Sequence, residues 1–168
     1  MYKEAGKALI WAEIPNLKQA ESYFLMAENF YKHLKERQLD EEYVGTQRAE
    51  NLILLNQFSE AAILLEKHSA PGSPFWNYRI GQALAHSSDE EKLRRSIKHF
   101  QTAIDMEIQK GDSKYLSAFY HELAKSLNRL HDPLFEDAYS KALVYCTNDK
   151  HRKQILQDIS NCQQACLV

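Results

Sequence analysis

The sequence predicts an all-α fold on three observations. Apolar and small residues recur at steps of three and four, as in Leu17, Ala20, Phe24 and Ala27, and this spacing places them on one face of a helix. Only 5 glycines and 4 prolines interrupt the 168 residues, fewer than the tight turns of a sheet-rich fold need. No stretch alternates apolar and polar residues for long. A chain of this length is expected to form one domain with a sizeable core.

Capping residues and prolines divide the chain into nine predicted helices. Ser73 and Asp132 each precede a proline suited to the first position of a helix. Ser88 and Glu91 have the spacing of a capping box. Further breaks or caps are expected at Pro15-Asn16, Asp40, Gly111-Asp112 and Asn148. The predicted helices cover residues 2–14, 16–36, 41–55, 58–69, 74–87, 89–109, 113–130, 134–146 and 149–166.

These helices repeat one pattern of small and large residues, and their short connections predict antiparallel pairs. In the second helix of each pair the pattern is Ala20/Phe24/Ala27, Ala61/Leu65/His68, Ser96/Phe100/Ala103 and Phe135/Tyr139/Ala142. In the first helices a small residue precedes a large one by three positions, in Ala8/Trp11, Ala49/Leu52, Gly81/Leu84 and Ala124/Leu127. A small residue lets two helix backbones cross closely, and the large one fills the space beside it.

This pattern resembles the tetratricopeptide repeat family, whose consensus alternates small and aromatic residues in the same register. The resemblance implies a right-handed α-solenoid of about four antiparallel helix pairs plus a C-terminal capping helix. The repeats would lie near residues 1–37, 41–70, 74–110 and 113–147, with the cap at 149–166, in a single domain over 1–168. The first two pairs match well. The third carries an inserted loop around residues 87–93, and the fourth has Phe135 in place of a small residue.

The resemblance also implies a concave face, lined by the first helix of each pair, that binds a peptide or protein. The expected binding residues are Tyr43, Gln47, Glu50, Phe75, Tyr78, Arg79, Gln82, His121, Lys125, Asn128 and Arg129, with His86 and Glu122 beside them. Tyrosine and arginine give large contact areas, and the amides of Gln and Asn can pair with an extended backbone. We therefore expect a scaffold or adaptor for a protein or peptide partner.

We do not expect the predicted face to bind the acidic C-terminus of a chaperone. Family members that bind the acidic C-terminus of a chaperone use a clamp of Lys and Asn residues for two carboxylates. Thr46 and Glu50 stand where the second repeat would need Lys and Asn. Lys125 and Arg129, one helical turn apart, remain suited to hold a single carboxylate.

Catalytic and metal-binding patterns do not assemble, so no enzyme, cofactor or metal is expected. His121-Glu122 begins like a zinc protease motif, but position 125 is Lys rather than a second His. The glycines are isolated, which excludes a glycine-rich phosphate loop. Cys146, Cys162 and Cys166 are expected to be reduced, partly buried thiols. Although the last two share a helix face, no second Cys/His pair completes a zinc site.

Charge and hydropathy limit the partners further. The formal net charge is −2, so nothing calls for a nucleic acid. The densest basic stretch, 92–99, is balanced by the acids at 89–91, and a second basic stretch lies at 150–153. No apolar run reaches the roughly 20 residues of a membrane span, and the N-terminus lacks the order of a secretory signal, so we expect a cytoplasmic protein. Two alternatives remain: a sensor of a short signalling peptide, and a homo-oligomer formed through the Ile155/Ile159/Cys162 stripe.

Overall fold

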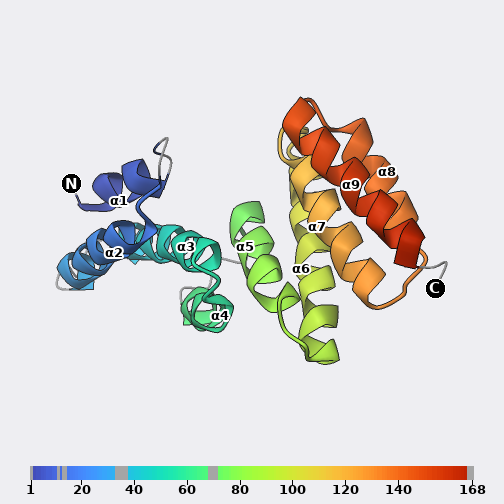
Figure 1. Ribbon diagram of the computed structural model, residues 1–168. Coiled ribbons are helices and arrows are strands. Elements are labelled where there is room, and N and C mark those ends of the chain that lie inside the picture. The colour runs from blue at the N-terminus through green and yellow to red at the C-terminus, as the bar shows by residue number, and fades with distance from the viewer. Residues whose placement is uncertain (1, 11, 13–14, 33–37, 68–71, 166–168) are drawn as a thin grey trace.

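The computed structural model describes residues 2–10, 12, 15–32, 38–67 and 72–165, and within these ranges the chain is helical with no strand (Figure 1). The predicted all-α class is therefore confirmed. The helices are α1 (Tyr2–Ile10), α2 (Leu17–Lys32), α3 (Gln38–Leu54), α4 (Phe58–Lys67), α5 (Pro74–Ala85), α6 (Glu90–Gln109), α7 (Leu116–Arg129), α8 (Phe135–Val144) and α9 (Asp149–Ala165).

Several helix starts follow the predicted capping chemistry. The Ser73 hydroxyl accepts a hydrogen bond from the backbone N–H of Trp76 at 3.4 Å, with Pro74 in the first turn of α5. The Asn148 side chain accepts from the N–H of His151 at 2.9 Å at the start of α9. One prediction is wrong by a residue, because Asp89 rather than Ser88 caps α6. A carboxylate caps as well as a hydroxyl and also favours the positive end of the helix dipole.

Two other predicted caps differ from the structure. Asp132 accepts a hydrogen bond from the N–H of Leu134 at 3.0 Å, but residues 133–134 form a turn and α8 begins only at Phe135. Asp40 lies within α3, which starts at Gln38, and its side chain is outside the described part of the structure.

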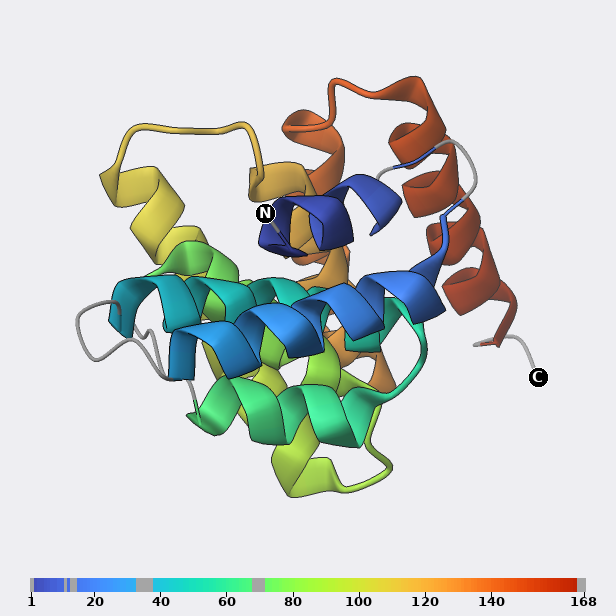
Figure 2. The same cartoon turned by 90° about the vertical axis from the view of Figure 1, so that its left-hand side faces the viewer.

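Each helix packs against the next one along the chain, and α1–α3, α3–α5 and α5–α7 contact each other as well. In Figure 1, α1 to α4 lie on one side of α5, and α6 to α9 lie on the other. Figure 2 views the molecule from the N-terminal side, where α1 and α2 lie nearest the viewer. The odd-numbered helices from α1 to α7 therefore form a continuous row.

The predicted small and large positions form the core. In the second helices of the pairs the buried residues are Ala20, Phe24, Ala27, Ala61, Leu65, Ser96, Phe100, Ala103, Tyr139 and Ala142. In the first helices they are Ala49, Leu52, Gly81, Leu84, Ala124 and Leu127. Full burial of one Phe or Leu side chain contributes roughly 1.5–3 kcal/mol.

The register predicted for the first helix is wrong. Ala8 is exposed, and Gly6 is the residue that faces α2. A Cβ atom on Gly6 would lie 2.9 Å from the Phe24 ring, just as one on Gly81 would lie 2.7 Å from the ring of Phe100. At both crossings the helices lie so close that only glycine fits. In α1 the small residue is therefore Gly6, two residues before the predicted Ala8. Trp11 lies outside the described part of the chain.

Candidate functional site

Side chains from α3 and α5 form a hydrogen-bonded network on the row of odd-numbered helices. The Arg79 guanidinium pairs with the Glu50 carboxylate and donates to the Gln82 side-chain oxygen at 2.9 Å. The Gln82 amide in turn donates to the Tyr78 hydroxyl oxygen at 3.0 Å. Four of the predicted binding residues are thus brought together, and their side chains are held in place before any ligand arrives.

The expected exposure of Glu50 is contradicted, because this residue is only 6% exposed. Its carboxylate faces α5 and is neutralised by Arg79, itself mostly covered. A buried carboxylate needs such a partner, since removing it from water is otherwise very costly. The role of this pair is to join α3 to α5, while Gln82 and Tyr78 stay half-buried at the surface.

The hydroxyl of Tyr78 remains available as a donor. Its burial raises the pKa of Tyr78, and the negative charge of Glu122 on α7 raises that pKa further. The phenol is therefore protonated at neutral pH. Since its oxygen already accepts from Gln82, the O–H of Tyr78 is left to donate to a further acceptor.

A cleft of about 300 Å³ continues this surface between α5 and α7. Its lining residues are Ala85, His86, Glu122, Lys125, Ser126 and Arg129. The Arg129 guanidinium donates to the backbone carbonyl of Ala85 and, at 2.8 Å, to that of Ser87. These carbonyls lie at the end of α5, where the helix itself provides no partners, so Arg129 acts as a cap supplied by the neighbouring helix.

The predicted carboxylate site at Lys125 and Arg129 is not open in this conformation, because both side chains already have partners. Lys125 pairs with Glu122 at 3.0 Å, and Arg129 is occupied by the two carbonyls. Lys125 keeps a side-chain exposure of 40%, so its ammonium can exchange Glu122 for a ligand, whereas Arg129 cannot leave without uncapping α5. The cleft presents both signs of charge.

The largest correction concerns His121, which is 3% exposed rather than open on a binding face. Its Nε2 lies 2.9 Å from a carboxylate oxygen of Asp158, and its Nδ1 lies 3.1 Å from Nε2 of His151. Both partners belong to α9, which covers this part of α7. The sequence signal was available in retrospect, since His151 and Asp158 lie seven residues apart and hence on one helix face.

The histidine cluster is not arranged as a metal centre. Asp158 and His151 contact opposite nitrogens of the His121 ring. Within the described ranges no three His, Cys, Asp or Glu side chains are placed to share a metal ion. Ser117 and Cys146, which lie near His151, are 5% and 4% exposed, so a substrate has no access to them in this conformation.

The remaining predicted site residues are scattered. Gln47 and Asn128 are half-buried on α3 and α7. Phe75 packs edge-on against Tyr115, with ring centroids 4.6 Å apart, and so belongs to the margin of the core. Tyr43 lies in α3, but its side chain is outside the described part of the structure.

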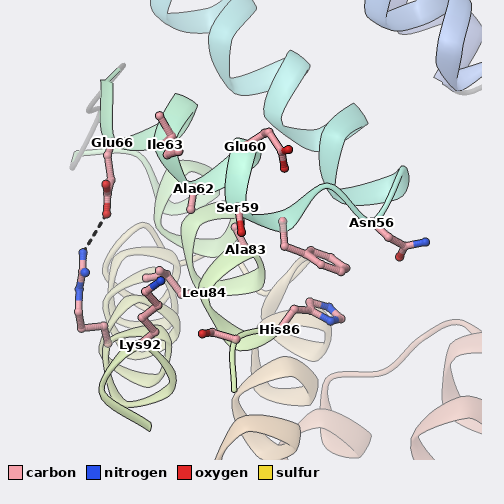
Figure 3. Close-up of a pocket in the computed structure, with 13 residues that line it drawn as sticks. Asn56, Ser59, Glu60, Ala62, Ile63, Glu66, Ala83, Leu84, His86 and Lys92 are labelled. Atoms are coloured by element: carbon pink, nitrogen blue, oxygen red, sulfur yellow. Dashed lines mark hydrogen bonds and ion pairs between the residues drawn. The ribbon is translucent and has the colours of Figure 1, made fainter. Parts of the chain in front are cut away.

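A second cleft, of about 410 Å³, lies between α4 and α6 and was not predicted (Figure 3). Ala62, Ala83 and Leu84 are among the apolar residues that line it, and Ile63 at its edge is 67% exposed. The Phe58 and His86 rings stack with centroids 3.6 Å apart. The Glu66–Arg95 ion pair, drawn dashed in Figure 3, spans from α4 to α6 at 3.0 Å. Ser87 and Lys92, from the insertion predicted at residues 87–93, are among its lining residues.

An apolar cleft of about 500 Å³ lies between α8 and α9. Phe135, at a position where the predicted pattern has a small residue, lines it together with Tyr139, Ile159 and Cys162. Phe135 is half-buried and packs edge-on against Tyr139, with ring centroids 6.3 Å apart. Cys146 and Cys162 are free thiols, and Cys166 lies outside the described residues.

Comparison with known proteins identifies no relative. A scan against models of protein families found no match, and a search of curated proteins found none either. The tetratricopeptide resemblance therefore stays a prediction. None of the helices in the part of the chain that the structure describes is long and apolar enough to cross a bilayer.

Proposed function

We propose that the chain is a non-enzymatic scaffold whose row of odd-numbered helices binds an extended peptide or protein segment. In this proposal α1/α2, α3/α4, α5/α6 and α7/α8 are tetratricopeptide-like pairs of a right-handed solenoid, and α9 caps its end. The contacts among α1, α3, α5 and α7 support that arrangement, because a solenoid of helix pairs lines its concave face with one helix from each pair.

The observation that carries the proposal is the fixed polar network at the centre of this face. Gln82 is held between Arg79 and Tyr78, yet it keeps one N–H and one lone pair for a ligand. A side-chain amide with one free N–H donor and one free acceptor lone pair matches the alternating C=O and N–H groups of an extended backbone. Because the side chains are ordered beforehand, binding loses less conformational entropy than with mobile side chains.

The α5–α7 cleft supplies the charged end of the proposed site. Lys125 and Glu122 already form an exchangeable pair there, so a peptide carrying one acidic and one basic side chain can replace their mutual contact. Net attraction to a strongly acidic or basic partner is not favoured, since the two charges offset each other. The proposed partner is thus a mixed-charge segment in an extended conformation.

Peptides selected from a random displayed library against the whole protein test this proposal. Gln47→Ala and Lys125→Ala remove side chains on the proposed face that do not hold helices together. Each is expected to weaken binding of a selected peptide about fivefold to tenfold, roughly 1–1.4 kcal/mol, measured by fluorescence anisotropy.

Gln109→Ala and Lys98→Ala are matched controls, because they make the same changes at exposed positions of α6. The controls are expected to leave the affinity unchanged. Equal affinities for all four variants would place the binding elsewhere and contradict the proposal.

A further inference from the structure

The seam between α7 and α9 contains a continuous chain of hydrogen-bonding groups. A carboxylate only accepts, so the Nε2–H of His121 donates to Asp158, at 2.9 Å. Nδ1 of a neutral His121 is then an acceptor and receives the Nε2–H of His151, at 3.1 Å. On its other side, Nδ1 of His151 lies 3.3 Å from the hydroxyl oxygen of Ser117. That hydroxyl donates its own proton to the backbone carbonyl of Ala142 at 2.9 Å, so it accepts from His151 only when Nδ1 carries the one extra proton.

This geometry limits how many protons the two histidines can hold. A hydrogen bond between two imidazole nitrogens needs one donor and one acceptor. If both rings were protonated, the Nδ1–H of His121 would point at the Nε2–H of His151, and two positive charges would meet across 3.1 Å. The docked arrangement therefore accepts at most one extra proton, whereas separated histidines accept two.

The groups around the pair do not remove this restriction. From α7, Glu122 contributes a negative charge near His151, and from α9 Asp158 is already bound to His121. Arg152 lies on α9 and donates to the backbone carbonyl of Cys146 at 2.7 Å. On the α8 side the titratable neighbours are Tyr139, near the His121 ring, and the Cys146 thiol, near His151. The Cys162 thiol of α9 faces the Tyr139 hydroxyl. No second carboxylate is hydrogen-bonded to the pair within the described residues.

The apolar attachment of α9 is narrow. Ile155 is fully buried, and Ile159 and Cys162 pack against the core at its edge. Leu156 is 50% exposed, and most other residues of α9 are polar. With so few apolar anchors, the polar seam makes up a large share of the contacts that hold this helix.

We propose that His121, His151 and Asp158 form a pH-sensitive latch, and that acidification releases α9 from α7 and α8. Release uncovers a surface that includes Ser117, His121 and Tyr139, which α9 otherwise covers. The latch is independent of the proposed peptide binding, because it rests only on the contacts between α7 and α9.

The direction of the pH effect is set by proton binding. Burial lowers the pKa of His151, and the neighbouring His121 lowers it further. A histidine that resists protonation when docked binds fewer protons than in the released state. Docking is therefore most favourable above about pH 6.5, the ordinary histidine pKa, and weakens as the pH falls below it. For one excluded proton, the equilibrium constant for release rises about 30-fold between pH 7.5 and pH 5.

Hydrogen–deuterium exchange of the whole protein measures this release locally. Peptides covering residues 149–165 are expected to lose about 30-fold in protection factor between pH 7.5 and pH 5, after correction for intrinsic exchange rates. Peptides from α2, which contains no histidine, should retain their protection. A local readout is needed because burial also lowers the pKa of His86 and of His99, which makes overall stability fall in acid as well.

His151→Gln tests the role of the histidine pair. The amide can turn either its N–H or its C=O toward His121, so it suits both protonation states of that ring. In this variant the loss of α9 protection in acid should shrink to less than about threefold. His131→Asn is the matched control: it removes an exposed histidine at a positive φ that Asn tolerates, and it should keep the full loss.

Three results would overturn the latch: α9 protection in the unmodified protein that does not change with pH, an equal loss in His151→Gln, or an equal loss throughout α2. The first and third need no variant, so the test stands even if His151→Gln does not fold.

Discussion

Tyr78 and His121 occupy equivalent places on α5 and α7, each three residues before the small residue at a helix crossing, Gly81 or Ala124. Tyr78 is half-buried with no helix over it in the described contacts, whereas His121 is covered by α9. The place of a residue relative to a helix crossing is therefore not enough to predict a binding residue. The presence or absence of a covering helix decides whether the same position becomes a surface or a seam.

The two regions also differ in the chemistry that joins neighbouring helices. Between α3 and α5 the contact is the Arg79–Glu50 pair, and a guanidinium keeps its charge at every physiological pH. Between α7 and α9 the contact runs through two imidazoles, and burial lowers the pKa of His151, so this contact responds to acid where a guanidinium does not. The α3–α5 contact is thus expected to persist at every physiological pH, and the α7–α9 contact to weaken in acid.

The largest expected effect on stability comes from removing the Arg79–Glu50 pair between α3 and α5. Arg79→Ala leaves the Glu50 carboxylate buried without a partner and should lower the free energy of unfolding by about 3 kcal/mol, measured by urea denaturation at pH 7.5. Arg95→Ala is the control, because its pair with Glu66 is about half exposed and contributes about 0.5 kcal/mol. Similar losses for the two variants would show that burial of the first pair does not matter.

A smaller loss of stability is expected from breaking the histidine contacts between α7 and α9. His121→Ala removes the partner of Asp158 and of His151 and should cost about 2 kcal/mol in urea denaturation at pH 7.5. At pH 5 the cost should be smaller, because the latch contributes less there in the unmodified protein. A cost that stays constant or increases in acid would argue against the difference between the two regions.

The smallest effect concerns the cap between α5 and α7. Arg129→Lys keeps the charge but cannot donate to the carbonyls of Ala85 and Ser87 in the same forked geometry. The expected loss is about 1 kcal/mol of unfolding free energy. Lys98→Arg, the reverse substitution at an exposed position of α6, is the control and should leave stability unchanged. An Arg129→Lys protein as stable as the original would mean that the end of α5 needs no cap from α7.

The sequence was sufficient for the helices and most of the core, since periodicity and caps are local signals. Phe100 and Leu65, for example, are buried as their spacing indicates. The register of α1 was missed because Ala8 and Gly6 are both small, and only the distance to Phe24 distinguishes them.

The binding face was harder to predict because it depends on contacts between distant segments. Nothing near Glu50 in the sequence indicates that Arg79 will neutralise it, and nothing near His121 indicates that α9 will cover it. The α4–α6 cleft likewise forms from three segments, of which only the insertion at residues 87–93 is visible in the sequence.

The proposed binding face is tested most directly by mapping a selected peptide on the folded protein through backbone amide chemical shifts. We expect the largest changes on Gln47, Gln82 and Lys125 and their neighbours on α3, α5 and α7. Changes concentrated instead around Ile63, Lys92 and Arg95, in the cleft between α4 and α6, would contradict the proposed face.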